Sequence, residues 1–97
     1  MFIILTYDIN LSDGGKRLQK VAKICEGYGI RVQNSVFELT INSAELIKLK
    51  AKIESIIDRK TDSVRLYTIG KESSRHVEVL GVNNTIELSN QNEAIML

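Results

Sequence analysis

The stretch FIILTYDI, residues 2–9, decides the fold of this chain. It is a nearly continuous apolar run, and so short a run without helical periodicity is typical of a β-strand that is covered on both faces. Alternation places Phe2, Ile4 and Thr6 on one face of this strand, and Ile3, Leu5 and Tyr7 on the other. Both faces are apolar, so each of them needs a covering layer.

Two segments with helical periodicity follow this strand. The first has an apolar stripe made of Leu18, Val21, Ala22, Cys25 and Tyr28, and the second has one made of Leu46, Leu49, Ile53, Ile56 and Ile57. Ser12 or Asp13 is expected to cap the first helix, and Asn42-Ser43 the second. The second helix is expected to end at residues 60–62.

The remaining segments predict strands. Residues 31–41 mix β-branched, aromatic and polar residues, which indicates one long strand, or two if the segment doubles back. Residues 63–69 alternate, residues 77–80 predict a short strand, and residues 85–88 a last one, before a tail. Two helices on one face of an antiparallel sheet make an α+β sandwich, and the ferredoxin-like βαββαβ arrangement with an extra C-terminal strand is its simplest form.

These elements place a single domain at residues 1–81 and a C-terminal extension at residues 82–97. Two helices cover only one face of the sheet, although the strand at residues 2–9 is apolar on both. A bare face of this kind would be a large exposed apolar patch. A second copy of the chain is the default cover, so we expect a homodimer packed sheet to sheet.

Composition limits the possible functions. The chain has 97 residues and 10.9 kDa, with 43% hydrophobic and 26% charged residues, which argues against a disordered protein. Its net charge is only +1, so affinity for nucleic acid requires a local basic patch. Cys25 is the single cysteine and cannot form an internal disulfide. With no recognisable signal peptide or membrane span, we expect a cytoplasmic protein without a membrane partner.

Asp8 is the first candidate for chemistry. It ends the first strand and, by alternation, shares a face with Thr6 and Ile4. A turn aspartate that only binds loop amides is the ordinary interpretation. The functional interpretation is a ligand for Mg²⁺, which one carboxylate binds weakly. A two-fold axis near Asp8 would supply a second Asp8, and the two carboxylates would then hold one ion.

Basic residues at the first helix form the second candidate. Lys16, Lys20 and Lys23 lie opposite the apolar stripe, with Arg17 alongside. Most such stripes are simply solvated, but cations in the first turn oppose the helix dipole. A phosphate bound at the free amides would relieve this repulsion, so Lys16, Arg17 and Lys20 are predicted to contact nucleic acid.

The third candidate is the predicted strand at residues 31–41. One strand face would carry Arg31, Gln33, Ser35 and Phe37, and this polar face is read either as a dimer interface or as a site beside Asp8. His76 has no second ligand at a recognisable spacing and is expected to be a surface histidine.

Several short motifs together resemble one known family. They are Tyr7-Asp8-Ile9, Gly15-Lys16-Arg17, the run YGIRVQNSVFE at residues 28–38, the run DSVRLY at residues 62–67, and Val79-Leu80-Gly81. This pattern resembles the CRISPR-associated protein two family, the small partner of the CRISPR integrase. The resemblance covers residues 2 to about 81.

The resemblance implies a ferredoxin-like fold, a symmetric homodimer, and a C-terminal strand, here Val77–Leu80, that pairs with the partner's sheet. It implies that Asp8 binds metal, one Mg²⁺ being shared by the two Asp8 of a dimer. Tyr7, Arg17, Arg31, Ser35 and Phe37 are the companions it implies. The sequence departs from the family pattern in its sparser arginines near the first helix and in residues 82–97, which carry Glu87 and Glu93.

Three functions remain open at this level. The first is a Mg²⁺-dependent endonuclease acting on RNA or DNA, with Asp8, Arg31 and Ser35 as catalytic residues and Lys16, Arg17, Lys20, Tyr7 and Phe37 binding nucleic acid. The second is a non-catalytic adaptor that bridges integrase subunits on duplex DNA during spacer acquisition. The third is a toxin-type ribonuclease of the same architecture.

Overall fold

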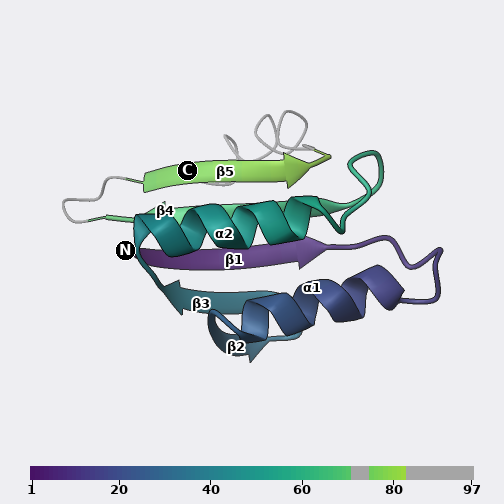
Figure 1. Cartoon of the computed structure of the whole chain (residues 1–97), viewed down its shortest axis with the longest axis horizontal. Coiled ribbons are helices and arrows are strands. Elements are labelled where there is room, and N and C mark those ends of the chain that lie inside the picture. Colours follow the sequence, from purple (N-terminus) through teal and green to yellow (C-terminus); the bar gives the residue numbers. More distant parts are fainter. Residues whose placement is uncertain (71–74, 83–97) are drawn as a thin grey trace, which may run out of the picture.

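The computed structural model describes residues 1–70 and 75–82, which form one antiparallel sheet and two helices (Figure 1). The strands are β1 (Phe2–Asp8), β2 (Gly29–Gln33), β3 (Val36–Thr40), β4 (Ser63–Ile69) and β5 (Arg75–Gly81), and the helices are α1 (Lys16–Glu26) and α2 (Ser43–Glu54). The sheet order is β2-β3-β1-β4-β5.

The apolar β1 takes the central position that its sequence predicts. It pairs antiparallel with β3 on one side and with β4 on the other, and β5 extends the sheet beyond β4. Both helices lie against the same face of the sheet (Figure 1). This confirms the predicted α+β, ferredoxin-like architecture with an extra C-terminal strand.

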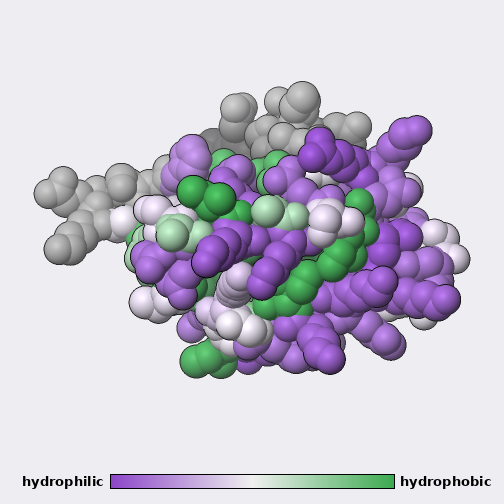
Figure 2. All heavy atoms as spheres, viewed as in Figure 1, coloured by the Kyte–Doolittle hydropathy of each residue, from purple (hydrophilic) through white to green (hydrophobic). Residues whose placement is uncertain are grey.

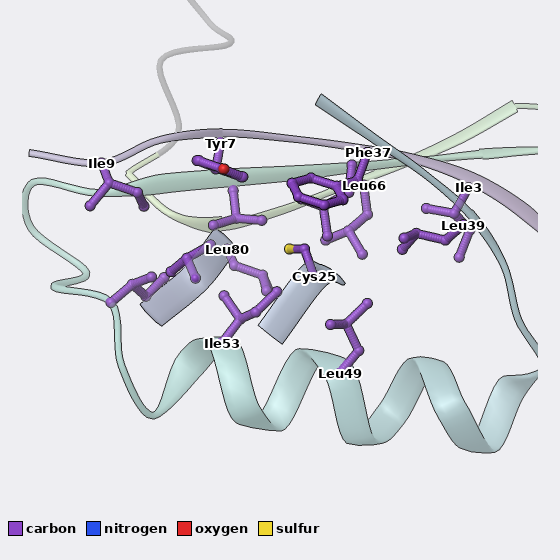
Figure 3. Close-up of a cluster of buried hydrophobic side chains, with 14 of the residues drawn as sticks. Ile3, Tyr7, Ile9, Cys25, Phe37, Leu39, Leu49, Ile53, Leu66 and Leu80 are labelled. Carbon is purple, nitrogen blue, oxygen red and sulfur yellow. The ribbon is translucent and has the colours of Figure 1, made fainter. Parts of the chain in front are cut away.

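The core fills the space between the sheet and the helices. Ile3, Leu5 and Tyr7 of β1 are buried on this side, and Cys25 of α1 lies among them with no exposed surface (Figure 3). Cys25 is therefore buried, as its place in the apolar stripe indicates, and burial raises the pKa of its thiol to about 12.

The opposite side of the sheet, here called the open face, has no helix over it. Alternation and strand register assign to it Phe2, Ile4, Thr6 and Asp8 of β1, Ile30 of β2, Val36, Glu38 and Thr40 of β3, Arg65, Tyr67 and Ile69 of β4, and Val77 and Val79 of β5. Phe2, Ile30, Ile69 and Val77 are among the large hydrophobic residues exposed in the single chain. The predicted bare apolar face is therefore present.

Residues 31–41 were expected to form one strand or two, and the second alternative holds, because the chain turns at Asn34-Ser35 and β2 pairs with β3 as a hairpin. Strand β5 pairs with β4 of its own chain and forms an edge of the sheet, and its expected pairing with a partner's sheet stays a prediction. Two local predictions require correction. Helix α2 ends at Glu54 and not at residues 60–62. Gly15, with φ of 86°, occupies the N-cap of α1, although the Asp13 carboxylate accepts the Gly15 and Arg17 N–H groups.

The prediction for α2 is confirmed. The Asn42 side chain accepts the Glu45 N–H at 2.8 Å, and the Glu45 carboxylate accepts the Asn42 N–H at 3.0 Å, which makes a capping box. The strand expected at residues 85–88 and the extension from residue 83 onward lie outside the described residues. None of the helices in the described parts has the length and apolar character needed to cross a bilayer.

Candidate metal and nucleic-acid site

Asp8 lies at the end of the central strand, on the open face. Strand β1 alternates buried and partly exposed residues without a break, and Asp8 continues this alternation as an exposed residue. Its pairing with Ser63 of β4 stays in register, so no bulge turns the side chain toward the core. The carboxylate makes no ion pair or hydrogen bond with residues 1–70 or 75–82. It is available to a ligand approaching the open face.

Arg65 is the nearest cation to Asp8 by register, and the sequence analysis did not single it out. Because Thr6 pairs with Arg65 and Asp8 with Ser63, Arg65 is a diagonal neighbour of Asp8, a relation that places side chains about 7–8 Å apart. Its guanidinium lies 5.3 Å from the centre of the Tyr67 ring. Its Nε is buried and has no acceptor in the described part of the chain. Alternation along residues 63–69, combined with the pairing to β1, would have found it.

The turn between β2 and β3 lies beside the end of β1. The Tyr7 N–H donates to the Ser35 carbonyl at 3.1 Å, and the Tyr7 hydroxyl donates to the Asn34 carbonyl, also at 3.1 Å. Burial raises the pKa of Tyr7, and the nearby Arg31 opposes this rise. Tyr7 and Ser35 are thus brought together next to Asp8, where Tyr7 fixes the turn that carries Ser35.

Arg31 does not share a face with Asp8. It pairs with Phe37, whose ring belongs to the core, so Arg31 lies on the helix side of the edge strand β2. There its guanidinium is 3.6 Å from the Glu26 carboxylate of α1 and 5.3 Å from the centre of the Phe37 ring. Arg31 and Phe37 thus share a side of the sheet, as predicted, but on two paired strands, whereas Ser35 lies in the turn between them.

Phe37 has no exposed surface and stacks on Tyr7, with ring centroids 6.2 Å apart (Figure 3). Tyr7 itself is 6% exposed. Both rings therefore support the core beneath the end of β1. Direct contact of Tyr7 or Phe37 with nucleic acid remains a prediction that this burial disfavours.

Arg17 is held by carboxylates of its own chain. Its Nε donates to the Asp62 carboxylate at 2.8 Å, and its Nη1 is 3.2 Å from the Asp13 carboxylate. The hydrogen bond to Asp62 raises the pKa of Arg17. The sequence analysis placed Asp62 only at the end of the second helix and in the DSVRLY motif, and it missed this pair because 45 residues separate the two partners.

Lys16, Lys20 and Lys23 form the predicted row on the outer side of α1. All three are exposed, and with Gln19 they line a shallow hollow on this helix. Figure 2, viewed from the helix side, shows hydrophilic side chains over both helices and hydrophobic ones between them. The row extends over about 10 Å, given a rise of 1.5 Å per residue. It lies on the helix side of the sheet, whereas Asp8 lies on the open face.

A single chain offers little to a metal ion. Within the described residues, no three His, Cys, Asp or Glu side chains are grouped closely enough to hold one. Asp8 is the exposed carboxylate at the strand end, and its hard oxygens suit Mg²⁺, which retains several waters when bound. The donor chemistry fits such an ion when a second chain supplies a second carboxylate.

Comparison with known proteins identifies the family. The model of the family described as CRISPR associated protein Cas2 matches residues 1–77. The chain belongs to the Cas2 family. The resemblance drawn from the short motifs is therefore confirmed.

Individual relatives agree with this assignment. The chain is 46% identical over 90 residues to a protein of Halalkalibacterium halodurans named CRISPR-associated endonuclease Cas2, which covers 91% of this chain and 94% of the relative. It is 42% identical over 89 residues to a Moorella thermoacetica protein named CRISPR-associated endoribonuclease Cas2 1, covering 90% and 93% of the two chains. The solved structure of Streptococcus pyogenes Cas2 at pH 6.5 matches with a TM-score of 0.68 and 50% identity, over 74% of this chain and 89% of that one.

Proposed function

We propose that this protein acts as a homodimer in CRISPR spacer acquisition, as a Mg²⁺-dependent endonuclease on RNA or DNA phosphodiesters. The observation that carries the proposal is the exposed Asp8 carboxylate on the open face of a Cas2-family chain. Two relatives bear the names endonuclease and endoribonuclease, which supports nucleic acid as the substrate class. The substrate bond is the phosphodiester, whose negative charge a metal ion neutralises.

The open face supports the dimer. It carries exposed apolar side chains from β1, β2, β4 and β5, and Asp8 lies at one end of it. Packing this face against the same face of a second chain around a two-fold axis buries those side chains in both chains at once. A two-fold axis passing near Asp8 would also bring the two Asp8 carboxylates together, and they would then be the residues that hold one Mg²⁺.

When bound, the ion supplies Lewis-acid stabilisation of the phosphate and an activated water. The chain's own residues would hold the ion and orient the groups around it. Asp8 supplies the ligand oxygen, Arg65 lies on the same face as the cation nearest to it, and Tyr7 fixes the turn that carries Ser35. The side chain of Arg31 is 43% exposed at the edge of the sheet. There it is placed to contact a nucleic-acid strand that runs past the turn between β2 and β3.

The first prediction is that Asp8→Asn lowers the rate of Mg²⁺-dependent cleavage at least a hundredfold, because the amide lacks the charge that binds the ion. Purified wild type and variant are compared on single-stranded RNA and on duplex DNA, with and without EDTA. Glu54→Gln is the matched control, since it removes one carboxylate from the last residue of α2, which lies on the opposite side of the sheet from Asp8. Equal rates for wild type and Asp8→Asn would show that Asp8 does not carry the cleavage.

A second function, a non-catalytic adaptor that bridges integrase subunits on duplex DNA, is favoured by one observation. The lysine row of α1 and the Asp8 carboxylate lie on opposite sides of the sheet. DNA held through phosphates along α1 is therefore not held against Asp8, and such contacts position a duplex without reading its sequence. Full spacer acquisition by Asp8→Asn, with loss in Lys16→Gln/Lys20→Gln, would favour the adaptor. With the family identified, the toxin-type ribonuclease has no observation in its favour.

A further inference from the structure

The Asp62 carboxylate is fully buried and yet accepts five hydrogen bonds. Its donors are the N–H of Asn10 at 2.8 Å, the N–H of Asp58 at 2.7 Å, the Arg17 Nε at 2.8 Å, the Arg17 Nη2 at 3.4 Å and the Thr61 hydroxyl at 3.3 Å. A buried carboxylate with this many donors is a satisfied charge that holds its donors in place. Donors from Asn10, from Arg17 of α1 and from the loop of Asp62 itself thus converge on one side chain.

The guanidinium N–H groups of Arg17 donate to acceptors of its own chain. Besides Asp62, its guanidinium contacts the Asp13 carboxylate at 3.2 Å and the Asn10 carbonyl at 3.3 Å. Its side chain is 20% exposed. A phosphate would have to compete with two carboxylates for this guanidinium, whereas the exposed Lys16 and Lys20 face no such competitor among the described residues.

This cluster holds the backbone on both sides of Asp8. Asn10, whose N–H and carbonyl are both engaged, follows Asp8 by two residues. On the neighbouring strand, Asp62 directly precedes Ser63, the register partner of Asp8. Arg17 and Asp62 therefore fix the exit of β1 and the entry of β4 relative to each other, and Asp8 lies between these two fixed points.

We propose that Arg17 is a positioning residue, which through its ion pair with Asp62 sets the place of the Asp8 carboxylate and makes no contact with nucleic acid. The proposal rests on the proposed function only in that Asp8 is taken as the metal ligand. It assigns different tasks to neighbouring cations of α1: Lys16 and Lys20 contact phosphate, and Arg17 serves the carboxylate site.

Two measurements separate these tasks. A residue that neutralises a phosphate of duplex DNA contributes about 0.9 to the slope of log affinity against log salt concentration. A residue that orients a metal ligand changes metal affinity about 10–100-fold when it is removed. Arg17→Gln is therefore expected to weaken Mn²⁺ binding at least tenfold, measured by electron paramagnetic resonance, and to leave the salt slope for a DNA duplex unchanged.

Lys20→Gln is the matched control, since it removes one positive charge from the same helix. It is expected to lower the salt slope by about 0.9 and to leave Mn²⁺ affinity unchanged. Arg17→Lys keeps the charge without the Nε donor and is expected to restore part of the Mn²⁺ affinity. The double variant Asp62→Asn/Arg17→Gln should lose less Mn²⁺ binding free energy than the sum of the losses in the two single variants, because the two residues act as one unit.

The inference is overturned if Arg17→Gln lowers the salt slope as Lys20→Gln does and leaves Mn²⁺ affinity unchanged. Amide hydrogen exchange tests the positioning role of Arg17 independently of the proposed metal function. If the wild type binds no Mn²⁺, the proposed metal function fails, whereas faster exchange at the Asn10 amide in Arg17→Gln still supports the positioning role. Unchanged exchange at the Asn10 amide in a folded Arg17→Gln refutes that role.

Discussion

Asp62 keeps its charge in a place from which water is excluded. Burial alone raises the pKa of this carboxyl, but the hydrogen bonds from Arg17, Asp58 and Asn10 outweigh burial and hold the pKa below its ordinary value. A carboxyl whose pKa is lowered by folding stabilises the folded state above its unfolded pKa of about 3.9. That stabilisation is lost as the pH falls through the lower pKa of the folded state.

We therefore expect the free energy of unfolding of Asp62→Asn to fall about 2 kcal/mol below that of the wild type at pH 7, the scale for disturbing a buried hydrogen-bonded group. As the pH falls below about 4 the difference should narrow, because the unfolded wild-type chain takes up a proton at Asp62 there, whereas the folded chain does so only at a lower pH. Urea denaturation at a series of pH values measures both quantities. Glu54→Gln is the control, and a difference that stays constant with pH would contradict this account.

At this scale the sequence predicts some site residues and conceals others. Alternation along β1 was sufficient to place Asp8 on the face with Thr6 and Ile4. The pair of Arg17 with Asp62 could not be predicted, because nothing local connects a residue of α1 with one in a loop 45 positions later. Only the sheet, which brings β4 beside β1, makes these two side chains neighbours.

Helix α2 begins at a signal that is readable from the sequence alone. Asn42 and Glu45 exchange side-chain and backbone hydrogen bonds, and each satisfies an N–H that the helix leaves free. The element boundary follows from these two residue types at this spacing.

Asn42→Ala should lower the free energy of unfolding by about 1 kcal/mol, the ordinary value for a lost N-cap. Ser43→Ala, one position inside α2, is the control and should change it by less than about half as much. Thermal and urea unfolding measure the difference. A variant with wild-type stability would mean that water replaces the cap without cost.

The hairpin of β2 and β3 was harder to predict than the helices. The turn at Asn34-Ser35 contains neither glycine nor proline, and although Asn and Ser favour turns, strand-forming residues continue on both sides of them. The run is therefore compatible with one long strand, and only the pairing of Arg31 with Phe37 shows that the chain reverses. The end of α2 was placed too late for a similar reason, since Ile56 and Ile57 continue the apolar stripe into the turn that follows the helix.

For the whole molecule, the open face predicts self-association. Ile69 and Val77 are 41% and 43% exposed on it in the single chain, and Ile47 is 65% exposed on α2. These three residues are similar in character but lie on opposite sides of the sheet. They therefore distinguish an interface on the open face from one on the helices.

Ile69→Asp/Val77→Asp should raise the dimer dissociation constant about a hundredfold, because a charge buried without a partner costs several kcal/mol. Ile47→Asp should leave it unchanged. Light scattering coupled to size exclusion gives the mass, which for wild type should be about twice that of one chain. A wild type that remains a 10.9 kDa monomer at micromolar concentration would refute the sheet-to-sheet dimer.

Gly81, the last residue of β5, has one further consequence. Its φ is 85°, and a Cβ there would clash with the Asp62 carbonyl, the same carbonyl that accepts the Val82 N–H. Gly81 also pairs with Ser63, which pairs with Asp8, so the backbone leaves β5 at the carboxylate end of the sheet. A fluorescent reporter attached at position 82 should therefore change its emission when a ligand binds at the end of the sheet that carries Asp8, whereas a reporter attached at position 47 on α2 should not.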